Sequence, residues 1–223
     1  MQPIIVFDVN ETLLDLGPVR IWFSERFGNQ PDVSTWFSEL LRLTFVSSVL
    51  DRYHPFTDLA AAALETTTAI HGADTTEDDM KRIRGILATL PPHEDVAQGL
   101  DRLHGTGFTV AALTNSPQGT AETQLENAGI ADLFDAVMSV DMVRRFKPHS
   151  SVYRAAAQKL GVATSDLVMV AAHDWDVAGA MASGCAGVFI TRPGQVYSPS
   201  LDASTMTATD IHDAAGQIIA RYA

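Results

Sequence analysis

Polar side chains follow four separate apolar runs of this sequence, and each run has the length of a buried strand. The first run, residues 4–7, ends at Asp8. The residues that follow the other three runs are Thr114 and Asn115, then Lys147, and then His173, Asp174 and Asp176. Burying a charge is costly unless something compensates, and α/β proteins place their chemistry beyond the carboxyl ends of parallel strands. The pattern therefore predicts that these side chains converge on one catalytic site.

Asp8 and Lys147 are the pair with the clearest chemical meaning. A buried lysine beside an aspartate offsets part of the desolvation of both groups and keeps the carboxylate ionised, as a nucleophile requires. Thr114 and Asn115 would offer a hydroxyl, an amide and loop N–H groups to an anion, and they could equally cap the next helix. The alternative for the pair itself is that Asp8 caps a turn and Lys147 lies at the surface.

The elements that position these groups can be placed from periodicity. Apolar residues at helical spacing predict helices at 21–27, 35–50, 59–70 and 77–90, with a break at 28–31. From residue 92 onward, strands at 108–113, 136–140, 167–172 and 186–191 alternate with helices. This alternation predicts an α/β fold, with a Rossmann-like parallel sheet formed by residues 1–15 and 92–223. Residues 16–91 are predicted to form an all-helical cap over the strand ends.

The composition limits the partners that the chain could have. Its 223 residues are 46% hydrophobic, which is enough for a sizeable core, and the formal net charge is −12. Such an acidic chain repels nucleic acid and anionic membranes but can bind a small anion at a locally positive site. We see no signal peptide and no apolar run of about 18 residues that could cross a membrane. Cys185 is the single cysteine, which excludes an internal disulfide and fits a cytoplasmic protein.

Four stretches, in this order, resemble the motifs of the haloacid dehalogenase superfamily: FDVNETLLD at 7–15, LTNS at 113–116, Lys147-Pro148, and AAHDWD at 171–176. The resemblance implies a Rossmann-like core with a helical cap. It also implies that Asp8 is a covalent nucleophile, that Lys147 is its partner and that Thr114 is the polar residue of the second motif.

Two departures from the superfamily's phosphatases bear on the reaction. Most of those phosphatases carry a general-acid Asp two residues after the nucleophile, where this chain has Asn10. They also carry a magnesium-binding Asp where this chain has Ala172, although Asp174 could substitute. Breaking a carbon–halogen bond needs neither a metal nor an acid, so we expect no cofactor. An Mg²⁺-dependent phosphatase and a catalytically silent binding module stay open as alternatives.

Other features resemble the L-2-haloacid dehalogenases: Trp175-Asp176, the spacing of Lys147 and Tyr153, and RYHPF at 52–56. The chain departs from them at Asn10, which replaces a Tyr, at Phe37, which replaces a halide-binding Arg, and at Ala171 and His173, which replace Ser and Asn. The resemblance implies hydrolysis of short (S)-2-haloalkanoic acids to (R)-2-hydroxy acids through an ester on Asp8. It also suggests a homodimer.

The resemblance also suggests which residues would contact this substrate. Thr114, Asn115 and the N–H groups after Asp8, at Val9 and Asn10, would bind the substrate carboxylate. The residues expected around the halogen side are Phe37, Leu41, Phe56, Asn115 and Trp175, and Tyr153 is also expected in the substrate site.

Glu11 and His173 suggest how water could cleave the ester. Glu11 stands where the family usually has Gly, and His173 lies in the loop of the fourth motif. A neutral histidine is the natural general base near pH 7, and a carboxylate on its other nitrogen would orient it. We therefore predict a Glu11–His173 dyad as the water activator. Asp176, held by Lys147, is the alternative base, and a loop histidine beside a helix-capping Glu11 is the structural alternative.

Overall fold

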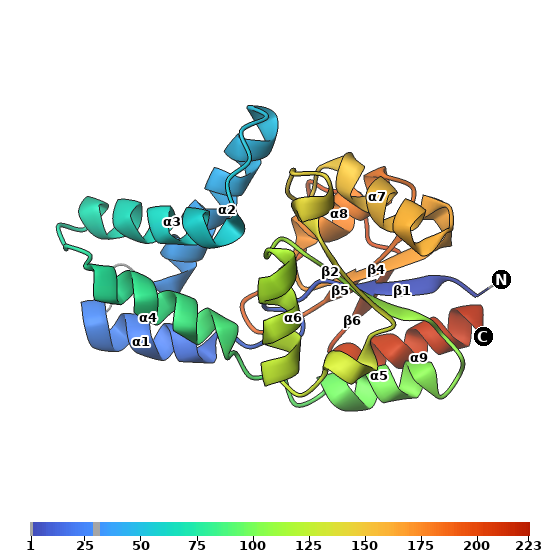
Figure 1. Ribbon diagram of the computed structural model, residues 1–223. Coiled ribbons are helices and arrows are strands. Elements are labelled where there is room, and N and C mark those ends of the chain that lie inside the picture. Colours follow the sequence, from blue (N-terminus) through green and yellow to red (C-terminus); the bar gives the residue numbers. More distant parts are fainter. Residues whose placement is uncertain (1, 29–31) are drawn as a thin grey trace.

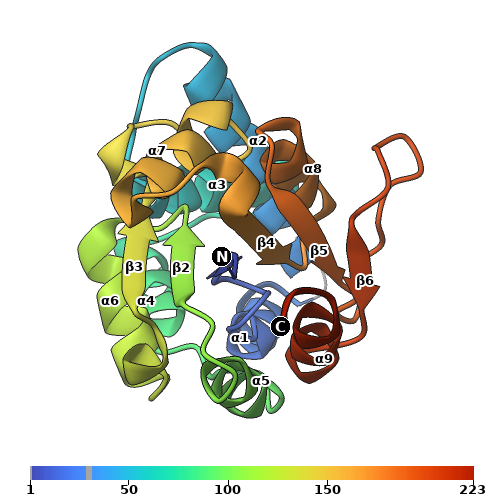
Figure 2. The same cartoon turned by 90° about the vertical axis from the view of Figure 1, so that its right-hand side faces the viewer.

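The computed structural model describes residues 2–28 and 32–223, and its centre is one parallel sheet (Figure 1). The strand order is β3-β2-β1-β4-β5-β6 (Figure 2). The strands are β1 (Ile4–Phe7), β2 (Val110–Thr114), β3 (Ala136–Ser139), β4 (Leu167–Ala171), β5 (Ala186–Ile190) and β6 (Met206–Ala208). In the register, Ile5 lies opposite Val110 of β2 and Val168 of β4. This central place explains the continuous apolar run of β1, because neither face of the strand meets water.

Helices cover both faces of the sheet (Figure 2). One face carries α7 and α8, the opposite face carries α5 packed on α9, and α6 lies beside the edge strand β3. Their bounds are α5 (Val96–His104), α6 (Gln118–Asn127), α7 (Ser150–Leu160), α8 (Asp174–Ala182) and α9 (Ile211–Tyr222). Within the described residues, short 3₁₀ turns occur at Ala131–Leu133, Val140–Met142 and Thr164–Asp166. The predicted α/β fold with a parallel sheet is confirmed.

In the part of the chain that the structure describes between β1 and α5, four helices form a separate group beside the strand ends (Figure 1). The fully buried indole of Trp36 anchors this group, since its Nε1 donates a hydrogen bond of 3.0 Å to the carbonyl of Ala60. The four are α1 (Gly17–Phe27), α2 (Val33–Val49), α3 (Phe56–Ile70) and α4 (Glu77–Ala88). They lie within the residues 16–91 assigned to a cap; the domain boundaries themselves stay a prediction.

The structure differs from the sequence prediction mainly near the carboxyl terminus. The strand β6 has only three residues, Met-Thr-Ala, and is too short to contain an apolar run from which it could be predicted. Helix α9 was also missed, although its buried residues Ile211, Ala214 and Ile218 recur at helical spacing. Helix α8 begins at Asp174 rather than Val177, so the acidic residues of the fourth motif lie in its first turn. The break predicted at 28–31 lies outside the described residues except for Gly28.

Candidate active site

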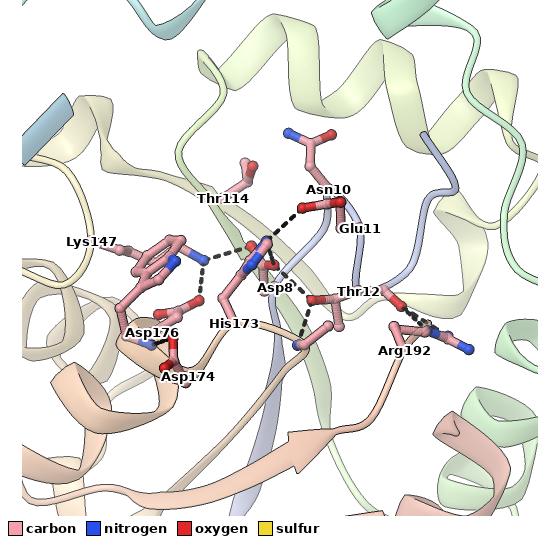
Figure 3. A network of polar contacts seen from close by, with 12 residues as sticks. Asp8, Asn10, Glu11, Thr12, Thr114, Lys147, His173, Asp174, Asp176 and Arg192 are labelled. Atoms are coloured by element: carbon pink, nitrogen blue, oxygen red, sulfur yellow. Dashed lines mark hydrogen bonds and ion pairs between the residues drawn. The ribbon is translucent and has the colours of Figure 1, made fainter. Parts of the chain in front are cut away.

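The ammonium group of Lys147 lies at the centre of the polar network (Figure 3). Its Nζ is 2.7 Å from Oδ1 of Asp8, 2.6 Å from Oδ2 of Asp176 and 2.8 Å from the carbonyl of Leu113. These contacts account for all three N–H groups of a lysine. Because Lys147 is fully buried, its charge would be costly to remove from water if it had no partner. The two carboxylates that contact its ammonium group offset this desolvation cost.

The loop after β1 holds Asp8 from its other side. Thr12 Oγ1 donates to Asp8 Oδ2 at 2.7 Å and accepts a hydrogen bond of 2.9 Å from the N–H of Ala172. The carbonyl of Val9 accepts from the N–H groups of Leu13 and Leu14, so the chain turns back and brings Thr12 against the carboxylate. The sequence analysis missed Thr12, although it lies within the first motif, four residues after Asp8.

The three buried charges have different titration behaviour. Burial raises the pKa of Asp8, but the charge of Lys147, aided by His173 and by hydrogen bonds from Lys147 and Thr12, outweighs burial and holds this pKa below its ordinary value. Burial lowers the pKa of Lys147, whereas Asp176 and Asp8 outweigh it and hold this pKa above its ordinary value. Burial raises the pKa of Asp176 despite the nearby ammonium. Asp8 is therefore the carboxylate of the pair that is held ionised.

Tyr153 supports Asp176. Its hydroxyl donates to Asp176 Oδ1 at 2.6 Å, and its side chain is fully buried. A substrate contact was predicted for Tyr153, but the structure gives its hydroxyl to Asp176. The carboxylate of Asp176 is thus bonded on one oxygen to Tyr153 and on the other to Lys147.

His173 and Glu11 lie together at the edge of this network. Nε2 of His173 is 3.6 Å from Oε2 of Glu11 and 3.8 Å from Oδ2 of Asp8. The backbone of Glu11 has a φ of 63°, in the left-handed region that favours glycine. Burial raises the pKa of Glu11, which the charges of His173 and Arg20 only partly offset. The two predicted members of the dyad are therefore neighbours, next to the predicted nucleophile. Glu11 was expected on the nitrogen opposite the one that takes the proton, but Glu11 and Asp8 both face the same nitrogen, Nε2.

His93 fixes the backbone of Glu11. Its Nε2 lies 3.1 Å from the Glu11 carbonyl oxygen, which can only accept, so this nitrogen must carry the proton. Burial and the charge of Arg192 lower the pKa of His93, which keeps the ring neutral near pH 7. The hydrogen bond helps to hold Glu11 in its left-handed conformation.

A cavity of about 330 Å³ borders His173 and Glu11 between the cap helices and the core. Of the residues predicted on the halogen side, those that line this cavity are Phe37, Leu41 and Trp175. Phe56 instead packs against Phe146, with ring centroids 6.2 Å apart. Arg20 lies in the same cavity wall and donates to Asp15 at 2.8 Å.

The polar residues predicted to bind a carboxylate are engaged with neighbouring loops. Asn115 Oδ1 accepts from the N–H of Lys147 at 3.0 Å, and Thr114 Oγ1 accepts from the N–H of Ser116 at 3.1 Å. Asn10 Nδ2 donates to Ser116 Oγ at 3.2 Å, and Asn10 Oδ1 accepts from Gln124. These side chains brace the loops that carry Asp8 and Lys147, and whether they also touch substrate stays a prediction.

Arg192 is a second site-forming residue that the sequence analysis missed. Its Nη2 and Nε donate to the carbonyl of Thr12 at 2.9 and 3.2 Å, and its Nη1 pairs with Asp95 at 2.7 Å. The signal available was its position just after the last predicted strand, at the same end of the sheet as Asp8. Arg192 therefore holds the loop that presents Thr12 to the nucleophile.

Comparison with known proteins agrees with this geometry. Residues 3–184 match the family described as haloacid dehalogenase-like hydrolase, which is most of the chain. The chain belongs to the haloacid dehalogenase-like hydrolase family. It is 30% identical over 201 residues to (S)-2-haloacid dehalogenase H-109 of Pseudomonas putida, covering 88% of this chain and 90% of that protein. It is 31% identical over 195 residues to an (S)-2-haloacid dehalogenase of Pseudomonas sp. strain YL, covering 86% and 84%.

A solved structure shares the fold of this haloacid dehalogenase-like hydrolase. The L-2-haloacid dehalogenase of Xanthobacter autotrophicus with chloropropionic acid covalently bound superimposes with a TM-score of 0.90 at 23% identity, covering 98% of this chain and 99% of that chain. In the described part of this chain, no helix combines the length and the apolar character needed to cross a membrane.

The donor set does not fit the magnesium of the family's phosphatases. Among residues 2–28 and 32–223, no group of three or more His, Cys, Asp or Glu side chains is arranged to hold a metal ion. Asp8 and Asp176 face the ammonium of Lys147. Asp174 accepts from the N–H of Trp175 through Oδ1 and from that of Ser198 through Oδ2, so it fixes local backbone instead of replacing a lost ligand. An octahedral ion that needs several free oxygens would find none of these carboxylates unengaged.

Proposed function

We propose that this hydrolase converts short (S)-2-haloalkanoic acids into (R)-2-hydroxyalkanoic acids through a covalent ester on Asp8. The observation that carries the proposal is the ionised carboxylate of Asp8, held 2.7 Å from Lys147 Nζ, with His173 3.8 Å away on its other oxygen. A nucleophile and a base for water lie side by side, whereas Asn10 cannot protonate a leaving group. The family's (S)-2-haloacid dehalogenases give the substrate class.

The first half-reaction is a displacement at carbon. One oxygen of Asp8 attacks C2 of the substrate from the side opposite the halogen, the carbon–halogen bond breaks, and the halide leaves with the electron pair. Lys147 and Thr12 keep the carboxylate ionised and aimed, and the positive charge of Lys147 attracts the substrate carboxylate. The configuration at C2 inverts, so an (S)-substrate gives an (R)-product.

The second half-reaction hydrolyses the ester. Water attacks the carboxyl carbon of Asp8 while Nε2 of His173 takes its proton, and the charge of the nearby Glu11 carboxylate stabilises the imidazolium that forms. The tetrahedral intermediate collapses, the bond from carbon to the product oxygen breaks, and His173 returns the proton to that oxygen. Asp8 is formed as the carboxylic acid with one oxygen from water, and it releases the remaining proton of that water to solvent to regenerate the carboxylate. Asp176 is less suited as the base, because both of its oxygens are bonded to Lys147 and Tyr153.

The function can be tested by substrate choice. Each enantiomer of 2-chloropropionate and p-nitrophenyl phosphate are supplied with and without EDTA, and chloride or nitrophenol is measured. We expect chloride release from the (S)-enantiomer, with (R)-lactate as product and no effect of EDTA. Phosphatase activity that EDTA removes and Mg²⁺ restores would assign the chain to the phosphatases instead. No turnover of either compound would favour a silent binding module.

We also propose a homodimer located in the cytoplasm. The exposed apolar residues Val46, Val49 and Leu50 lie together at the carboxyl end of α2, and a second copy could cover them. The single, buried Cys185 suits a reducing compartment. Analytical ultracentrifugation gives the mass of the particle, and cell fractionation gives its location.

A further inference from the structure

The ring of His173 stacks with two aromatic rings. The centroid of Phe37 is 5.7 Å from that of His173, with planes 23° apart, and the centroid of Trp175 is 5.0 Å away, with planes 17° apart. Both neighbours are therefore stacked on the imidazole, so its edge is left to face Glu11 and Asp8. The stack leaves His173 little freedom to rotate.

The cap supplies both ends of a longer column. Phe45 contacts the ring of Trp175 edge-on, with centroids 5.6 Å apart. Phe37 and Phe45 belong to α2, whereas His173 and Trp175 belong to the loop after β4 and the first turn of α8. Both views place α2 beside α8 (Figures 1 and 2). Helix α2 therefore contacts the segment that carries His173 at two places, through Phe37 and through Phe45.

We propose that Phe37 is a positioning residue for ester hydrolysis: the cap completes the general base by stacking Phe37 on His173. The inference rests on the proposed dehalogenase function and adds to it. Sequence alone put Phe37 on the halogen side as an apolar wall. In the structure Phe37 lines the cavity and its ring also stacks on His173, so a cap residue and the water-activating residue are in direct contact.

The electrostatics of the stack favour one half-reaction over the other. The face of an aromatic ring attracts a cation within about 6 Å of its centroid. His173 becomes an imidazolium when it takes the proton from water, and the stacked rings of Phe37 and Trp175 then stabilise that charge together with the carboxylate of Glu11. Attack of Asp8 on C2 creates no charge on His173. Phe37 should therefore affect hydrolysis more than displacement.

The test measures the two half-reactions separately with (S)-2-chloropropionate in a rapid-mixing experiment. The chloride burst reports displacement, and the decay of the adduct, followed by mass spectrometry, reports hydrolysis. For Phe37→Leu we expect an unchanged burst rate and hydrolysis slowed roughly two- to thirtyfold, the range of one cation–π contact. Phe37→Tyr keeps the ring face and should hydrolyse the ester at close to the wild-type rate.

A matched control and an isosteric variant separate electrostatics from packing. Phe27→Leu removes a partly buried cap aromatic that packs on Trp22 and Phe23 instead of His173, and it should leave both rates unchanged. Replacing Phe37 with pentafluorophenylalanine preserves the ring shape, and so the fold, but reverses its electrostatic face. This variant should slow hydrolysis at least as much as Phe37→Leu.

Several outcomes would overturn the proposal. Phe37→Leu could slow the burst as much as hydrolysis, which would mean that Phe37 acts in displacement, on the halogen side of the substrate. A wild-type hydrolysis rate in the leucine or the pentafluoro variant would show that the face of the Phe37 ring does not contribute to ester hydrolysis. In each case the dehalogenase function would stand, because the burst would still occur. A wild-type enzyme that releases no chloride would instead remove the proposed function itself.

Discussion

Oε2 of Glu11 lies 3.6 Å from Nε2 of His173, and Glu11 reaches this position from a backbone φ of 63°. A residue with a side chain is strained in that region, and glycine is not. Glu11 is also largely buried, and its Oε2 has no hydrogen-bond partner within the described residues. A strained, buried and incompletely satisfied carboxylate is not explained by stability. Its place beside His173 gives it a functional explanation.

Replacing Glu11 with glycine should raise stability and lower activity together. Glu11→Gly relieves the left-handed strain and removes a buried carboxylate, which we expect to stabilise the fold by about 1 kcal/mol. Hydrolysis of the ester should slow, because His173 loses the carboxylate whose charge stabilises its imidazolium form. Urea unfolding and adduct decay measure the two effects. Glu11→Gln is the control, since it keeps the strain and should lose activity without the gain in stability. Glu11→Gly with wild-type hydrolysis would remove Glu11 from the dyad.

His173→Ala should separate the two half-reactions. Asp8 needs no base to attack C2, so the halide burst should remain at roughly one per subunit. Hydrolysis should fall by about 10²–10⁴-fold, the usual worth of general-base assistance, and an adduct on Asp8 should accumulate. His104→Ala removes a histidine that binds the carbonyl of Leu133 away from the site and should change neither rate. If the burst disappears as well, His173 acts during displacement and the assignment is wrong.

The rates of the two half-reactions should fall at different pH values as the solution is acidified. Asp8 has a pKa below its ordinary value of 3.8, so its carboxylate and the burst should survive to low pH. Glu11 has a pKa above its ordinary value of 4.5, so the ionised form that serves His173 is lost at a higher pH. The charged groups around Glu11 that set this balance are His173, Arg20, Asp8 and Asp15. Rapid mixing across pH should show hydrolysis declining first as the solution is acidified. Coincident pH profiles would contradict the order of these two pKa values.

Lys147→Met tests the buried charge network. It leaves Asp8 and Asp176 facing each other without a cation, which should cost about 3–5 kcal/mol of unfolding free energy at neutral pH. Adding Asp8→Asn should recover part of that loss, as a double-mutant cycle of urea unfolding would show. Since the folded pKa of Asp8 is lowered, its pairing stabilises the wild type above pH 3.8 and is lost as pH falls through the folded value. A loss that is independent of pH would argue against this pairing.

The sequence predicted the parts of the molecule that follow from periodicity and from motif spacing. The apolar run of β1 and the polar residues at the strand ends placed Asp8, Lys147 and Asp176 on one edge of a parallel sheet. What it missed depends on three-dimensional contacts. Thr12 and Arg192 act through hydrogen bonds to Asp8 and to the loop that carries it, and their positions in the sequence do not specify those partners. The hydroxyl of Tyr153 donates to Asp176 and not to the substrate site where it was expected. The stacking of Phe37 on His173 joins residues far apart in the chain and was not foreseeable from spacing.

The most direct test of the covalent scheme is one turnover in ¹⁸O-water with enzyme in excess over (S)-2-chloropropionate. Asp8 supplies the hydroxyl oxygen of the product, and water replaces that oxygen on Asp8. The first lactate formed should therefore contain no ¹⁸O, and the peptide that contains Asp8 should gain one heavy oxygen by mass spectrometry. Asp8→Asn, in which an amide replaces the nucleophilic carboxylate, should release no chloride in the same experiment. Heavy oxygen in the hydroxyl group of the first lactate would mean direct attack by water on C2 and would contradict the ester on Asp8.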